Sequence, residues 1–230
     1  MKGKIYSLCL VWTILMAVSC TSDKRQGAQV DDETAFDSVQ LPAYSGYTAV
    51  AVTHSVKDFD SWLKAYTDAS EPASRLSIYA SPDDPNLITV FELTKSHEDA
   101  KNNFTSDKLK EVMRNAGVLG EPKYQYFDVR YRATNPTNKV YRLGVTHRVE
   151  SYERWKKIFD EDEVIRAEAQ LELRAISTNA DDPLIINVMF ATDDIEKAKN
   201  VINSGELKKR MKEAGVLTEP DLSVFRVPGK

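Results

Sequence analysis

VTHSVKDFDSW (Val52–Trp62) is followed later in the chain by VTHRVESYERW (Val145–Trp155), a recurrence with a shift of 93 residues (145 − 52). In each copy a short stretch rich in β-branched residues runs up to the histidine, which predicts a strand. The aromatic residues after the histidine follow the i, i+3, i+7 spacing of an amphipathic helix. A strand that leads into a helix therefore occurs twice, and the neighbouring sequence decides how large the repeated unit is.

The similarity continues beyond the tryptophans with a shift of 98 residues (183 − 85). The turn DDP at 83–85 matches DDP at 181–183, and SDKLKEVMRNAGVLGEP at 106–122 matches SGELKKRMKEAGVLTEP at 204–220. The larger shift places five extra residues in the second copy, within DEDEVIRAEAQLE at 160–172. An internal duplication of units of about 80 residues has a longer period than solenoid repeats. It predicts two similar units in one chain.

Each copy predicts the order strand, helix, strand, strand, helix, strand. Short β-branched segments before the histidine and on either side of the DDP turn predict the first three strands. The last helix of each copy begins after a serine N-cap and ends at a glycine that can adopt the left-handed conformation. These capping residues are Ser106 and Gly117 in the first copy, and Ser204 and Gly215 in the second.

The order β-α-β-β-α-β is that of the ferredoxin-like unit, an antiparallel sheet with helices on one face. The other face of such a sheet needs cover, and an isolated unit of about 80 residues would be marginally stable. A second copy in the same chain can bury that face. We therefore expect an α+β protein in which two tandem ferredoxin-like βαββαβ repeats pack sheet to sheet as a pseudo-dimeric α+β barrel.

The VTHxVxxFxxW opening, the DDP turn and the SxxLKxxMxxAGVLxEP ending resemble the antibiotic biosynthesis monooxygenase-like branch of the dimeric α+β barrel superfamily. The resemblance spans about residues 47–227 and implies a barrel made of two ferredoxin-like units. It also implies that oxygenase members work without metal or flavin and use Asn, Trp and His in the barrel cavity, whereas other branches bind or degrade haem. The family's Asn has no counterpart that the motifs of this sequence identify.

The first residues have the pattern of an export signal. Two lysines precede an apolar run from Ile5 to Ala17, which is too short to span a membrane. The small residues after this run end at Cys20, and AVSC at 17–20 resembles a bacterial lipobox. Cleavage near Ser19 by an ordinary signal peptidase is the alternative. We expect export and a lipid anchor on Cys20 at the bacterial cell envelope, in the periplasm or on the outer surface.

The expected organisation has five segments. They are a signal peptide at 1–19, the lipidated cysteine and a polar tether at 20–46, the first repeat at 47–129, a linker at 130–139 and the second repeat at 140–230. The composition, 42% hydrophobic and 29% charged, is sufficient for a globular core in each repeat.

The charge balance argues against nucleic acid as a partner. The chain has a net charge of −4, and cleavage after Ser19 would remove two lysines and lower it to −6. Binding to phosphate backbones relies on clustered Lys and Arg. The densest short basic stretch is Arg130-Tyr131-Arg132, which we interpret as the polar exit from a strand.

His54 and His147 are the candidate catalytic residues. Strand alternation places His54 on the face of Val50 and Val52, and both histidines lie where a strand gives way to a helix. This location could put one imidazole at each mouth of the barrel, where it could transfer a proton or bind a ligand. The alternative is a half-buried histidine that bonds to a nearby backbone carbonyl.

Trp62 and Trp155 are candidate ligand-binding residues, although tryptophans at this helical spacing are more often core anchors. Arg166 lies within the run that carries the five extra residues and Arg174 just after it, and a guanidinium near His147 could hold a carboxylate with two hydrogen bonds. The alternative for the arginines is a solvated helix end. No metal and no cofactor are expected, because Asp before Pro in the DDP turns is ordinary turn chemistry.

The sequence thus leads to an exported lipoprotein whose α+β barrel binds a small apolar or carboxylated molecule, or serves as an assembly module. The alternative is a cofactor-free monooxygenase-like or isomerase-like enzyme with a histidine as its base. A third and weaker hypothesis is haem binding through one of the histidines. Membrane lipid and a small molecule are the expected partners, and further association between copies of the chain is left open.

Overall fold

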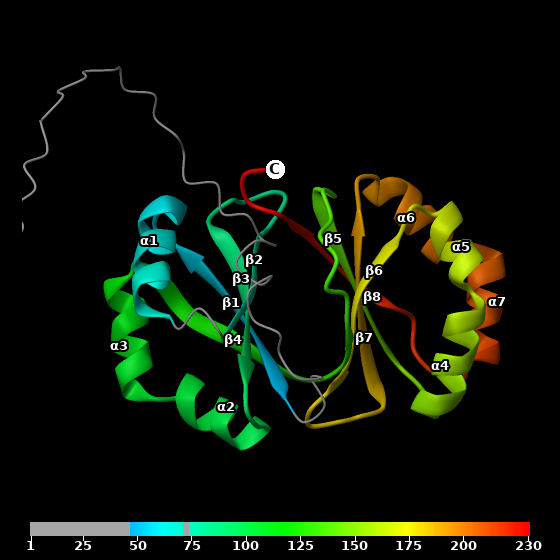
Figure 1. Ribbon diagram of the computed structural model, residues 1–230, viewed down its shortest axis with the longest axis horizontal. Helices are drawn as coiled ribbons and strands as arrows, with labels where there is room; N and C mark the ends of the chain where they lie inside the picture. The colour runs from blue at the N-terminus through cyan, green and yellow to red at the C-terminus, as the bar shows by residue number, and fades with distance from the viewer. Residues whose placement is uncertain (1–46, 71–73) are drawn as a thin grey trace, which may run out of the picture.

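The computed structural model describes residues 47–70 and 74–230 (Figure 1). The expected signal peptide, Cys20 and the tether lie outside these residues. Within the described ranges, no helix combines the length and apolar character needed to cross a bilayer. The description covers nearly all of both expected repeats and the segment between them.

The N-terminal half alternates strands and helices as predicted, with one additional short helix before the last helix. Its elements are β1 (Thr48–Val56), α1 (Phe59–Ala69), β2 (Arg75–Ala80), β3 (Leu87–Thr94), α2 (His97–Phe104), α3 (Asp107–Asn115) and β4 (Val118–Arg132).

The C-terminal half has the same order, and the five extra residues form part of one further helix, α5. Its elements are β5 (Tyr141–Arg148), α4 (Tyr152–Glu161), α5 (Glu163–Glu168), β6 (Glu172–Asn179), β7 (Ile185–Thr192), α6 (Ile195–Ile202), α7 (Gly205–Glu213) and β8 (Asp221–Arg226).

The predicted caps fix the ends of α3 and α7. The hydroxyl of Ser106 accepts a hydrogen bond from the amide of Leu109 at 3.3 Å, and Ser204 caps α7 in the same way. Gly117 and Gly215 have φ angles of +87° and +79°. This left-handed conformation turns the chain out of each helix into the next segment.

The eight strands form one closed barrel in the order β1-β3-β2-β8-β5-β7-β6-β4. The two halves meet at two seams of unequal length. At the longer seam β4 pairs with β6, from the residue pair Phe127–Asn179 to the pair Arg132–Ala175. At the shorter seam β2 pairs with β8 through one residue pair, Ala80–Arg226. Strand β4 therefore continues through the first three residues of the expected linker at 130–139.

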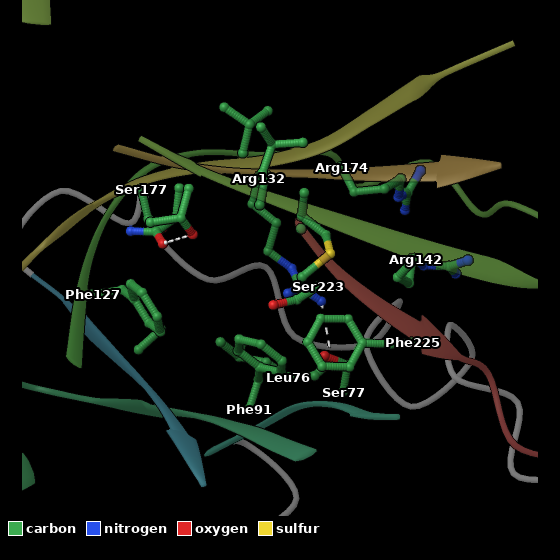
Figure 2. A pocket seen from close by; sticks show the side chains of 18 of the residues that line it. Leu76, Ser77, Phe91, Phe127, Arg132, Arg142, Arg174, Ser177, Ser223 and Phe225 are labelled. Atoms are coloured by element: carbon green, nitrogen blue, oxygen red, sulfur yellow. Dashed lines mark hydrogen bonds between the residues drawn. The ribbon is translucent and has the colours of Figure 1, made fainter. Parts of the chain in front are cut away.

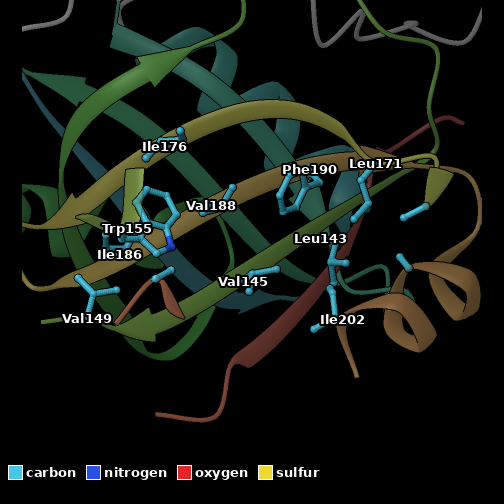
Figure 3. Packing of buried hydrophobic residues seen from close by; sticks show 13 residues of the cluster. Leu143, Val145, Val149, Trp155, Leu171, Ile176, Ile186, Val188, Phe190 and Ile202 are labelled. Carbon is cyan, nitrogen blue, oxygen red and sulfur yellow. The ribbon is translucent and has the colours of Figure 1, made fainter. Parts of the chain in front are cut away.

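The helices of the two halves lie on opposite sides of the molecule, with the strands between them (Figure 1). Along β1, Val50 and Val52 pack under the helices, whereas Ala49 and Ala51 belong to a cluster inside the barrel. Figure 3 shows the corresponding helix-side core of the C-terminal half, where Trp155 packs among the outward residues of β5, β6 and β7. The sheet therefore has an inner face toward the barrel and an outer face toward the helices.

Candidate functional site

The barrel interior contains a partly open cavity of about 190 Å³, lined by inward side chains from both halves. Four aromatic rings form an apolar wall, and their centroids are 5.8 to 6.5 Å apart: Tyr79, Phe91, Phe127 and Phe225. A cavity of roughly 150 Å³ is sufficient for benzene. The barrel interior can therefore hold a small molecule with one aromatic ring or a body of similar size.

Arginines gather at one end of this cavity, here called the arginine end: Arg132, Arg142 and Arg174. The strand register brings them together, because Ala191 pairs with both Arg142 and Glu172, and Ala175 pairs with Arg132. Figure 2 shows Arg132 extending across the cavity and the other two guanidinium groups at its edge. Among the described lining residues Asp221 is the single acid.

Each guanidinium is held by neighbouring groups. Arg142 is 1% exposed, and its Nη1 donates to the carbonyls of Lys139 at 2.8 Å and Tyr141 at 3.2 Å. Arg174 Nη1 lies 2.8 Å from Glu172 Oε1. Arg132 Nη2 donates to the carbonyl of Leu76 at 3.1 Å. Arginine is almost never fully buried unless it is paired, and a guanidinium carries five donors. These side chains bring three positive charges to the wall of the cavity.

A polar pair lies elsewhere on the cavity wall. Thr146 of β5 and Asn187 of β7 are cross-strand neighbours, and the Thr146 hydroxyl donates to Asn187 Oδ1 at 2.8 Å. The Asn187 Nδ2 atom is buried and has no hydrogen-bond partner among the described residues. The barrel cavity thus combines an aromatic wall, an arginine end and the polar pair Thr146–Asn187.

A second, smaller cavity of about 70 Å³ lies between the helices of the C-terminal half and the outer face of the sheet. We call it the helix-side cavity. Three of the predicted site residues line it: His147, Trp155 and Arg166. The His147 and Trp155 ring centroids are 5.7 Å apart, and the Arg166 guanidinium lies 3.9 Å from the centroid of Phe159. Arg174, in contrast, lines the barrel cavity.

The expected position of the histidines at the barrel mouths is wrong. Alternation correctly groups His54 with Val50 and Val52, but that face is the one that the helices cover. His54 contacts Trp62 with ring centroids 5.6 Å apart, and both histidines are 5% exposed. Burial lowers the pKa of His54 and of His147 to about 4, so both rings are neutral at pH 7.

Neither ring nitrogen of His54 or His147 has a hydrogen-bond partner among the described residues that meets normal geometry. A general base is usually oriented by a second group, and the described part of the chain provides none here. The catalytic role of the two histidines stays a prediction. Their surroundings resemble packed core more than a solvent-accessible site.

Trp62 and Trp155 are each 3% exposed and occupy equivalent places on α1 and α4. Trp62 stacks on Tyr66 with a centroid distance of 5.1 Å, and Trp155 stacks on Phe159 at 4.8 Å. Both residues anchor their helix to the sheet. This agrees with the alternative that the helical spacing suggested, a core position.

The DDP turns hold hydrogen bonds and ion pairs. Asp84 Oδ1 accepts from the amide of Asn86 at 2.9 Å, and Asp182 pairs with Arg148 at 2.5 Å. Asp181 lies 2.9 Å from Lys101 of the N-terminal half. Within residues 47–70 and 74–230, no three His, Cys, Asp or Glu side chains gather in a way that could hold a metal ion.

The sequence analysis did not identify three of the residues that line the barrel cavity. The sequence gives Arg132 and Arg142 as charged residues at strand ends, and Asn187 as a polar residue inside a largely apolar strand. These residues come together only because their side chains point into the barrel. Local sequence does not show which face of the sheet becomes the inside of the barrel.

No family model and no curated protein matches the sequence. Solved structures do match the fold. A candidate monooxygenase from Lactobacillus acidophilus superimposes with a TM-score of 0.51 at 9% identity, covering 78% of this chain and 93% of that chain. The chain has the α+β barrel fold.

A monooxygenase-like protein from Listeria innocua matches with a TM-score of 0.49 at 8% identity, over 83% of this chain and 99% of that chain. A ferredoxin-fold protein from Listeria monocytogenes, related to antibiotic biosynthesis monooxygenases, matches with a TM-score of 0.49 at 6% identity, over 81% and 98%. At these identities the similarity concerns the fold alone, and the chemistry of this barrel has to be argued from its own side chains.

Proposed function

We propose that the barrel cavity binds a small organic anion with an apolar body about the size of one aromatic ring. The observation that carries this proposal is the set of three guanidinium groups, of Arg132, Arg142 and Arg174, that line a cavity walled by aromatic rings. A guanidinium binds a carboxylate through two parallel, charge-assisted hydrogen bonds. The carboxylate of the ligand would lie at the arginine end and its body against the rings.

The size and lining of the cavity support a ligand of about ten non-hydrogen atoms, somewhat larger than benzene. Offset or edge-to-face contacts with the rings would stabilise a planar body. In a site shielded from water, the attraction between the anion and the guanidinium groups is stronger than at the surface. Affinity is therefore expected to depend on both the negative charge and the apolar body.

Calorimetric titration with benzoate, and with its neutral analogue benzamide, tests the proposal. Benzoate should bind and benzamide should bind at least about tenfold more weakly, since loss of a charge-assisted pair costs on the order of 1.5–3 kcal/mol. Arg132→Met should weaken benzoate binding. Arg130→Met is the matched control, because Arg130 is in the same strand but points to Thr178 and the ring of Tyr152. Equal affinities for benzoate and benzamide would contradict the proposal.

A second candidate is chemistry without a cofactor in the helix-side cavity. It is favoured by the convergence of His147, Trp155 and Arg166 on one small cavity. A histidine with a pKa of about 4 is a weak base at pH 7, so a bound substrate would have to raise that pKa. The NMR titration of His147 with and without added ligand tests this, and an unchanged pKa would exclude a role as base.

Haem does not fit either cavity as the side chains lie. The larger one, of about 190 Å³, exceeds a benzene-sized cavity only slightly, and a porphyrin is several times the size of benzene.

We further propose that the protein is exported and anchored at the cell envelope by lipid on Cys20. The lipobox-like AVSC at 17–20 supports this. Mass spectrometry of the protein from the membrane fraction should find acyl chains on Cys20, and Cys20→Ala should release the protein into the soluble fraction. An unmodified mature N-terminus elsewhere in the chain would contradict it.

A further inference from the structure

Glu172 of β6 lies just beyond the arginine end of the barrel cavity and pairs with one of its guanidinium groups. Glu172 Oε1 lies 2.8 Å from Arg174 Nη1, and Arg174 lines the cavity whereas Glu172 does not. We propose that Glu172 sets the affinity of the cavity for anions, because the carboxylate of a ligand has to compete with it for Arg174. This inference rests on the proposed function of the barrel cavity and identifies a residue that determines its charge selectivity.

The strand register places Glu172 beside the arginine end. Ala191 of β7 pairs with Arg142 of β5 and with Glu172 of β6, so the three side chains lie in one row on one face of the sheet. Arg142 lines the barrel cavity, so this is the inner face. Arg174 lies at a shift in the β6–β7 register, two residues from Glu172. The Glu172 carboxylate is thus a negative charge at the edge of the cavity.

The segment between the two repeats holds this carboxylate in place. The hydroxyl of Thr137, a residue that is 6% exposed, donates to Glu172 Oε2 at 2.7 Å. Asn135 Nδ2 adds a longer bond of 3.5 Å to Glu172 Oε1. These bonds fix the carboxylate in the position from which it pairs with Arg174, so the competitor of the ligand is ordered in advance.

The ion pair is partly shielded from water, since the side chains of Arg174 and Glu172 are 13% and 34% exposed. Figure 2 shows the Arg174 guanidinium at the edge of the cavity, turned away from the aromatic rings. An anion in the cavity that draws this guanidinium inward must first break its pair with Glu172, which leaves that carboxylate uncompensated. This cost lowers the affinity for anions, and removal of the Glu172 charge abolishes it.

Glu172→Gln tests the inference on the intact protein, because glutamine keeps the size and the acceptor for Thr137 but removes the charge. Calorimetry should show about 5- to 20-fold tighter binding of benzoate, between the values for an exposed ion pair and a buried charged hydrogen bond. Binding of the neutral benzamide should change by less than about twofold, since it gains no charge-assisted bond. A loss of shape at the site would instead alter both compounds.

Two further variants show whether the gain depends on the guanidinium. Glu150→Gln is the matched control, because Glu150 pairs with Arg154 and neither residue lines a cavity. It should change benzoate affinity by less than about twofold, since an exposed charge is screened. Arg174→Met added to Glu172→Gln should return benzoate affinity to within about threefold of the wild type, since one charge-assisted bond is lost again. Thermal unfolding of each variant checks that the fold is kept.

The outcomes separate this inference from the proposed function. Unchanged or weaker benzoate binding in Glu172→Gln, with benzoate bound by the wild type, would overturn the inference and leave the proposed function intact. A gain that persists in full in the double variant with Arg174→Met would also overturn it. Binding by Glu172→Gln but not by the wild type would support the inference and overturn the proposed function. A lack of binding by both would overturn both.

Discussion

The guanidinium carbon of Arg142 lies 5.8 Å from the ring centroid of Tyr79, and the two residues come from different halves of the barrel. Tyr79 is in β2 and Arg142 in β5, on either side of β8, where β2 and β8 share a single residue pair. The cation–π contact therefore bridges the weaker seam of the barrel. It also forms part of the wall at the arginine end of the cavity.

We expect this contact to contribute to the stability of the barrel. A double-mutant cycle with Tyr79→Leu and Arg142→Leu should give a coupling energy of about 1–2 kcal/mol in urea unfolding, as for a desolvated cation–π pair. The pair Arg130–Tyr152, with a distance of 5.7 Å and Arg130 exposed, is the matched control and should couple by less than about 1 kcal/mol. A coupling at the Tyr79–Arg142 pair no larger than that of the control would show that the seam does not depend on it.

Gly144 provides a way to fill the barrel cavity from within. A Cβ added there would meet Ser223 Cβ at 3.5 Å and Phe225 Cε2 at 3.6 Å, which are ordinary contacts. Gly144→Ala should thus stabilise the protein by about 0.5–1 kcal/mol, because glycine in a strand is conformationally costly. Gly144→Leu should occupy part of the cavity and abolish benzoate binding.

Circular dichroism during heating and calorimetry with benzoate check these two outcomes for Gly144. The alanine variant is the control, since it changes the same position but adds one methyl group. If the leucine variant folds and binds benzoate as tightly as the alanine variant, the ligand lies elsewhere.

Local patterns predicted the elements well because their causes are local. The serine caps at Ser106 and Ser204 and the glycines that end α3 and α7 depend on a few neighbouring residues. The sequence order of the strands then restricts the fold to few topologies. No local pattern predicted that the two seams differ in length. The long β4–β6 pairing and the single β2–β8 pair depend on how the two halves, which are far apart in the sequence, pack together.

The side of the sheet was the decisive ambiguity. Alternation grouped His54 with Val50 and Val52, yet both faces of β1 are apolar, because helices cover one and the barrel encloses the other. Alternation with a period of two residues divides a strand into two faces, but it does not show which face lies inside the barrel. Arg132 was hidden by a different cause: the β4–β6 register shifts between Val129 and Tyr131, so Arg132 points inward although Arg130, two residues earlier, points outward to Tyr152. Alternation therefore did not show that the two histidines lie on the helix side, and it gave no signal for Arg132, whereas Arg174 does line the barrel cavity.

Burial of the two histidines predicts a specific loss of stability in acid. The pKa of each is about 4 in the folded protein, below the value of 6.5 for an exposed histidine. Between these values the unfolded chain binds more protons than the folded protein, so the free energy of unfolding falls as pH decreases and levels off below about pH 4. From about pH 7.5 to about pH 4.5 the loss should be on the order of 2–3 kcal/mol per histidine.

His147→Gln isolates this effect from the titration of carboxylates. Urea unfolding of the variant and the wild type should give curves that run parallel above about pH 7 and converge toward pH 4.5, since the variant lacks one proton acceptor. For the double variant His54→Gln/His147→Gln, the free energy of unfolding should depend on pH still less than for the single variant. Parallel curves over the whole range would mean that His147 is accessible to protons in the folded protein.

Tryptophan emission distinguishes the two cavities, because both described tryptophans lie on the helix side of the sheet. Trp155 lines the helix-side cavity, Trp62 stacks on Tyr66, and neither lines the barrel cavity. Saturation with benzoate should therefore leave the emission spectrum unchanged while calorimetry records binding. Trp155→Phe serves as the control. Quenching by benzoate that disappears in this variant would place the anion under the helices beside His147, and the arginine end would lose its assigned ligand.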